Sequence, residues 1–181
     1  MKRFALFVFV LAAVSVSAFA QDDPTAKAVL AAPANMRDGA TVIKWKSDFT
    51  YDVLKQGTNN IVCYDKSGFP EQQAFMVECT SSKANLDRVA QNLKAEALGD
   101  KKATQTMLDA EEKDGTRVKP AFGSVWYHAM GPDKDHVRMH MTIAVPNATA
   151  QSMGLPDSGK DGGVWIMNAG TTTAHLMTPG E

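Results

Sequence analysis

The residues with the widest chemical repertoire gather in the last third of the chain. All four histidines occur there, with five methionines close to them in sequence: His128, His136, His140 and His175, and Met130, Met139, Met141, Met167 and Met177. Imidazole and thioether ligands together favour copper, whereas imidazoles with a carboxylate such as Asp133 or Asp135 favour zinc. One interpretation of this region is therefore a copper or zinc site.

The spacing of the histidines limits which of them can share an ion. Four residues separate His136 from His140, which places their Cα atoms about 13 Å apart on an extended strand, too far for one metal. We therefore expect ligands from neighbouring strands instead. The candidate metal ligands are His140 and His175, completed by His128, Met167 or Met177. Methionine also serves as flexible core filler, so the site depends on a fold that brings three or four ligands together.

Aromatic residues in the same region suggest a second kind of site. Trp126, Tyr127 and Trp165 could line a pocket for a small organic ligand, with Arg138 or Asn168 as its polar anchor. Packing in the core explains the same aromatic side chains equally well. Binding of a small ligand or of a protein partner, without catalysis, is our first functional hypothesis.

Common catalytic signatures do not occur in this sequence. It has no G-x-S-x-G elbow, H-E-x-x-H pair, P-loop or G-x-G-x-x-G fingerprint. A hydrolase-type enzyme with an unfamiliar site stays open as a further alternative.

One strand is expected to position the histidines. Apolar residues alternate strictly with polar ones before Pro146: Val137, Met139, Met141, Ile143 and Val145 against His136, Arg138, His140 and Thr142. A period of two predicts a strand with its apolar set on the core. His136 and His140 are then expected to share the opposite face.

The remaining pattern predicts an α+β fold. Strands are expected at residues 40–45, 51–54, 60–64, 74–79, 124–130, 164–167 and 174–177, and helices at about 83–98 and 103–114. Ser81 and Ser82 are the expected N-caps of the first helix, and the charged residues of both helices are expected to form a solvated face. We predict a small antiparallel sheet with this two-helix insert packed on one face, as a single domain over 40–181. Residues 21–39 are expected to be a loosely structured lead-in with a short alanine-rich helix.

The N-terminus has the pattern of a secretory signal peptide. Lys2 and Arg3 precede an apolar run, which ends in Ala18-Phe19-Ala20 ahead of a polar stretch. This is the order of an exported precursor with an A-x-A cleavage site. The apolar run is shorter than the roughly 20 residues of a membrane span. We expect residues 1–20 to be removed and a periplasmic or secreted chain to begin at Gln21, without a membrane-embedded part.

The cysteines and the charge fit that expectation. Cys63 and Cys79 are the two cysteines of the sequence, and an even count in an oxidising compartment favours one disulfide. Residues 1–20 hold two of the 19 basic and none of the 20 acidic residues, so the remainder carries a charge of −3. This mildly acidic balance excludes electrostatic binding of nucleic acid, which needs a concentrated basic face.

Two groups of residues resemble a family of uncharacterised exported bacterial proteins. The first group is Ala40-Thr41-Val42, Leu54, Gly57-Thr58-Asn59, Cys63, Met76 and Cys79; the second is His140 to Pro146, then Trp165, Met167, Gly170, Thr171, His175 and Met177. The resemblance covers both strand-rich regions and skips the helical middle. This chain departs from the family at Ile61, where a tryptophan is usual, and at Met139, where a proline is usual. The resemblance implies export and a shared fold, names no activity, and adds weight to His140 and His175.

Overall fold

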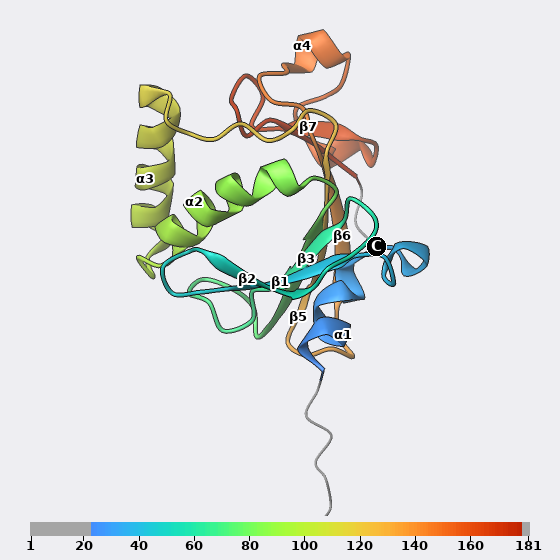
Figure 1. Ribbon diagram of the computed structural model, residues 1–181. Helices are drawn as coiled ribbons and strands as arrows, with labels where there is room; N and C mark the ends of the chain where they lie inside the picture. The colour runs from blue at the N-terminus through green and yellow to red at the C-terminus, as the bar shows by residue number, and fades with distance from the viewer. Residues whose placement is uncertain (1–22, 179–181) are drawn as a thin grey trace, which may run out of the picture.

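A computed structural model describes residues 23–178, so the expected signal peptide lies outside the described residues. Eight strands form one sheet in the order β2-β1-β3-β4-β5-β6-β8-β7 (Figure 1). The strands are β1 Thr41–Trp45, β2 Tyr51–Lys55, β3 Val62–Asp65, β4 Phe75–Thr80, β5 Val125–Gly131, β6 Arg138–Ala144, β7 Trp165–Met167 and β8 His175–Met177. All neighbouring strands are antiparallel except β1 and β3, which are parallel. The predicted α+β class is confirmed.

Helices occupy three stretches of residues 23–178. They are α1 Pro24–Ala28, α2 Leu86–Glu96, α3 Lys101–Asp114 and α4 Ala150–Met153, with the 3₁₀ turns η1 Val29–Ala31, η2 Ala34–Met36, η3 Lys83–Asn85 and η4 Gly159–Asp161. The Ala103 N–H donates to Asp100 at the start of α3, and Gly115 ends that helix with a φ of 79°. The predicted serine caps of α2 are wrong. The turn η3 intervenes before α2, and the Ser81 hydroxyl instead accepts a hydrogen bond from the Val125 N–H.

The N-terminal segment covers one face of the sheet. Residues 21–39 were expected to be a loose lead-in, but α1 and η1 pack against β3 and β4, and η1 also packs against β5. Ala28, Ala31 and Ala32 are buried against strand residues that include Val77. Small side chains allow the helical backbone to approach the sheet closely, so this segment belongs to the core.

The helix α2 covers part of the opposite face, with α3 packed against it (Figure 1). Its apolar residues Leu86, Val89 and Leu93 lie at helical spacing and pack on Tyr64 and Ile43. The two-helix insert on one face is therefore as the sequence predicts. Beyond α2, the same face continues over β4, β5, β6 and β8, and there it becomes polar.

The predicted burial of the apolar set along β6 is confirmed at Val145, which is 3% exposed, and is wrong at Val137 and Met139. Met139 is 44% exposed, Val137 is 37% exposed, and Met141 and Ile143 are half-buried. The N-terminal segment packs mainly on β3, β4 and β5. The strand also begins at Arg138, so His136 belongs to the preceding turn, where its Nδ1 contacts Asp133 at 2.8 Å.

Cys63 and Cys79 form the predicted disulfide. They are direct register partners on β3 and β4, and both are fully buried beneath the N-terminal segment. None of the helices within residues 23–178 combines the length and apolarity of a membrane span.

Candidate functional site

A cavity of about 330 Å³ lies between the two-helix insert and the polar part of the sheet. Five charged side chains and two histidines line it: Lys66, Glu78, Arg88, Glu96 and Arg117, with His128 and His175. Trp126, Thr142 and Asn92 are among the other lining residues. Ionisable groups at this density inside a concave site mark it as the leading candidate for function.

The helix α2 contributes its polar stripe to this cavity. Arg88, Asn92 and Glu96 follow one another at intervals of four residues, so all three face the same way. The sequence predicts a solvated face for the charged residues of this helix, but Arg88 is only 5% exposed. The helix therefore has one apolar stripe on the sheet and a second, polar stripe on the cavity.

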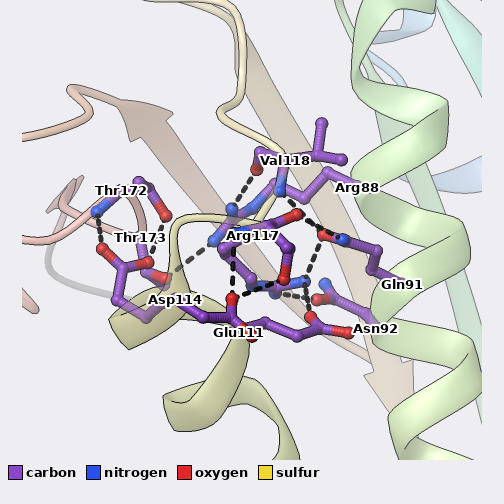
Figure 2. A network of polar contacts seen from close by, with 11 residues as sticks. Arg88, Gln91, Asn92, Glu111, Asp114, Arg117, Val118, Thr172 and Thr173 are labelled. Carbon is purple, nitrogen blue, oxygen red and sulfur yellow. Dashed lines mark hydrogen bonds and ion pairs between the residues drawn. The ribbon is translucent and has the colours of Figure 1, made fainter.

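Arg88 is a buried cation held by neutral groups. It donates to the Val118 carbonyl and to the Thr173 hydroxyl, the latter at 2.7 Å (Figure 2). Among residues 23–178, no carboxylate lies within ion-pair distance of its guanidinium. Burial, and then the nearby guanidinium of Arg117, lower the pKa of Arg88 to about 10 against the opposing charges of Glu112 and Glu111, so Arg88 stays charged at neutral pH.

Arg117 differs from Arg88 because a carboxylate lies within ion-pair distance of its guanidinium. Its guanidinium donates to Gln91 at 3.0 Å and to Asn92, and it lies 3.5 Å from Glu111 (Figure 2). These contacts fasten the chain after α3 to α2. Glu112 extends the network, since it accepts hydrogen bonds from the Thr172 N–H and hydroxyl just before β8.

The other end of the cavity contains a buried carboxylate cluster. The Lys66 ammonium lies 3.5 Å from Glu78 and 3.2 Å from Glu96. Burial opposes ionisation of Glu78, but Lys66, His128 and the Tyr64 hydroxyl outweigh it and lower the pKa of Glu78 to about 2. Burial instead dominates at Glu96 and raises its pKa. One lysine therefore faces two carboxylates.

The histidines lie on this side of the sheet. His128 and His140 are register partners on β5 and β6, and their rings stack with centroids 5.8 Å apart. His128 Nδ1 lies 3.3 Å from Glu78 without hydrogen-bond geometry, so this buried atom has no hydrogen-bond partner among the described residues. Burial lowers the pKa of His140, and the adjacent His128 acts in the same direction.

His175 enters the cavity from β8. Its Nδ1 lies 2.7 Å from the Thr173 carbonyl oxygen, so Nδ1 carries the proton and Nε2 is left as the acceptor of the neutral ring. Burial lowers the pKa of His175, and the Arg88 charge contributes in the same direction.

The fold brings only some of the predicted metal ligands together. His128 and His140 are adjacent, but His175 pairs with Ala144 and Met177 pairs with Thr142, farther along the sheet. Within residues 23–178, no group of three or more histidine, cysteine, aspartate or glutamate side chains is placed to hold a metal ion. A copper or zinc site at these residues stays a prediction from the sequence.

The predicted aromatic pocket is only partly assembled. Trp126 lines the cavity, but Tyr127 lies on the opposite face beside the N-terminal segment. The indole of Trp165 lies against Gly159, where an added Cβ would come within 2.6 Å of Nε1. The predicted anchors are elsewhere too: Arg138 is exposed beside Met130, and Asn168 lines a separate cleft of about 200 Å³.

The sequence analysis missed the charged groups of the cavity. Glu78 offered a signal, because it interrupts the otherwise apolar run of β4, and a carboxylate in such a strand needs a buried partner. The repeat of Arg88, Asn92 and Glu96 at one helical period offered another. Lys66 and Arg117 lie in connecting segments, where no periodicity marks them.

Three other hollows are larger but carry less chemistry, and one of them, of about 370 Å³, lies beside Trp45 and Leu54. A groove of about 410 Å³ beside β2 is lined mainly by apolar and amide side chains, with Lys83 as its charged residue. A hollow of about 650 Å³ borders α1, and two of its charged side chains are paired, Lys27 with Asp65 and Asp133 with His136. None of these hollows contains a buried charge that lacks an opposite partner.

These features define an α+β domain with a charged internal cavity between a helical insert and its sheet. Comparisons of the chain with protein-family models, with curated proteins and with solved structures give no match. The class of protein is therefore described by its own fold and cavity, and the family resemblance stays a prediction from the sequence.

Proposed function

We propose that this protein binds a small anionic organic ligand in the cavity beneath α2, with Arg88 as the anion-binding residue. The observation that supports this is the burial of Arg88 at 5% exposure beside Arg117, with no carboxylate in ion-pair distance among the described residues. A buried charge is normally paired, because transfer of an unpaired charge from water into a protein interior is unfavourable. A ligand carboxylate or phosphate would supply the missing partner.

The chemistry of the guanidinium suits this role. It has five N–H donors in a planar fork, and the bonds to Val118 and Thr173 use two of them. Such a fork binds carboxylates and phosphates in a bidentate manner, which gives both strength and orientation. His175 Nε2 and the indole of Trp126 lie in the same cavity as additional polar and apolar contacts.

The volume of the cavity limits the size of the ligand. Its 330 Å³ is near the lower end of the roughly 300–1,000 Å³ found for ligand sites. A small metabolite fits this range better than a peptide or a polymer.

The site would act outside the cytoplasm. The buried Cys63–Cys79 disulfide is compatible with an oxidising compartment, and the leader pattern over residues 1–20 supports export. In this proposal the protein captures its ligand in the periplasm or outside the cell.

Calorimetric titration tests this function directly. The mature protein is titrated with acetate, butyrate, hexanoate, benzoate and inorganic phosphate, alongside Arg88→Gln and the matched control Arg138→Gln, whose arginine is exposed and outside the cavity. We expect saturable binding of at least one anion to the wild type and to Arg138→Gln. Loss of a buried charge-assisted hydrogen bond predicts affinity at least about tenfold weaker in Arg88→Gln.

Two outcomes would overturn the proposal: no anion binds the wild type, or Arg88→Gln binds as tightly as Arg138→Gln. Arg88→Lys provides a second test if the glutamine variant does not fold, because it keeps the charge but loses the bidentate fork. We expect Arg88→Lys to bind weakly and in one-to-one stoichiometry.

A further inference from the structure

The two ends of the cavity carry opposite charge. Arg88 lies near the start of α2 and Glu96 at its end, and eight residues of α-helix separate their Cα atoms by about 12 Å. Both side chains line the cavity. A ligand that reaches from one residue to the other would pass along Asn92, which lies between them on the same stripe.

The positive end contains two guanidinium groups. Arg88 and Arg117 line it together, and Glu111 is the carboxylate that contacts Arg117. Glu111 and Glu112 also act on Arg88, but neither carboxylate is within ion-pair distance of its guanidinium, so Arg88 can still receive a ligand anion in direct contact.

The negative end has an excess of carboxylates. Lys66 is the cation in contact with both Glu78 and Glu96. Glu78 is further stabilised by the Tyr64 hydroxyl at 3.0 Å, and its side chain is only 8% exposed. The Glu96 side chain is 18% exposed and receives a hydrogen bond from Gln72 at 2.9 Å. Glu96 is therefore the more accessible carboxylate and the one with weaker compensation.

We infer that the ligand is dipolar, with an anionic group that binds Arg88 and an ammonium group that binds Glu96, joined by a chain of several atoms. This inference rests on the proposed function, since it assumes that Arg88 binds an anion. An α-amino acid carries both charges on one carbon and cannot reach both ends, whereas an ω-amino acid can. Burial raises the pKa of Glu96, and an incoming ammonium group offsets this by favouring the charged carboxylate.

A matched set of ligands separates this inference from the proposed function. Hexanoate, 6-aminohexanoate and norleucine have the same carbon chain and differ in whether, and where, they carry an ammonium group. We expect 6-aminohexanoate to bind the wild type at least about tenfold more tightly than either of the other two, as a charge-assisted hydrogen bond predicts. The control variant Asp135→Asn, which removes an exposed carboxylate outside the cavity, should keep this preference.

The variant Glu96→Gln should remove the preference while the affinity for hexanoate stays within about twofold, because the Arg88 end is unchanged. Glutamine keeps the size of the side chain and one acceptor oxygen for the hydrogen bond from Lys66 or from Gln72. Equal binding of hexanoate and 6-aminohexanoate to the wild type overturns the dipolar ligand and leaves the proposed function standing. The dipolar ligand is also overturned if hexanoate, 6-aminohexanoate and norleucine all fail to bind, or if phosphate alone binds. If Glu96→Gln does not fold, the affinities of hexanoate and 6-aminohexanoate for the wild type still test whether the ligand is dipolar.

Discussion

The buried carboxylate of Glu78 predicts a specific dependence of stability on pH. Its pKa is lowered from 4.5 to about 2, and at about 1.4 kcal/mol per unit of pKa this difference corresponds to about 3 kcal/mol of folding free energy. Because the folded pKa lies below the unfolded one, this stability is present above pH 4.5. It is lost as the pH falls from 4.5 towards 2, where the folded protein also takes up the proton.

The measurement compares the wild type with Glu78→Gln, which cannot lose or gain this proton. Unfolding by urea is followed by tryptophan fluorescence from pH 7 to pH 2 with the disulfide intact. We expect the difference in unfolding free energy between the two proteins to be about 3 kcal/mol larger at pH 7 than at pH 2. Parallel curves over the whole range would refute the reasoning.

Glu96→Gln is the matched control with the opposite sign. Burial raises the pKa of Glu96 above its unfolded value, so its contribution is fully present below pH 4.5 and is lost as the pH rises through the folded pKa. The stability of the wild type relative to Glu96→Gln should therefore fall between acid and neutral pH. The same trend for both variants would mean that the two carboxylates do not differ as described.

Two further predictions concern the frame of the fold. Replacing both Cys63 and Cys79 by alanine should cost about 3 kcal/mol in the chain-entropy model and lower the melting temperature by roughly 6–12 °C, measured by circular dichroism; an unchanged melting temperature would count against a structural role. An added Cβ at Gly57 would lie 2.3 Å from the Gly39 carbonyl oxygen, whereas at Gly163 it meets nothing within 4 Å. Gly57→Ala should therefore lose about 1–3 kcal/mol in urea unfolding and Gly163→Ala almost nothing, and equal losses would contradict the close approach.

Local pattern predicted most of the strands but not which faces they bury. A period of two identified β6, and it separated Met139 from His140 onto opposite sides. Which side is covered depends on where the N-terminal segment lies, and this is set by contacts between residues far apart in sequence. The exposed fraction of Met139, 44%, reflects that tertiary arrangement.

The candidate site was harder to predict for a similar reason. Proximity in sequence suggested a cluster of histidines, and cross-strand pairing did bring His128 beside His140. The cavity, however, is closed by charges from α2 and from the connecting segments. Arg88 has the sequence context of a solvent-facing helix residue, and its contacts come from the segment after α3 and from the residues before β8.

The disulfide also fixes the register of β3 and β4, the two strands that place Glu78 in the cavity. Cys63 is opposite Cys79, and the next residues along place Tyr64 opposite Glu78. A slip of one residue between β3 and β4 would turn Glu78 towards the alanine-lined side, away from Lys66 and His128. The disulfide therefore fixes the register of β3 and β4, and in this register Glu78 lies on the cavity side of the sheet.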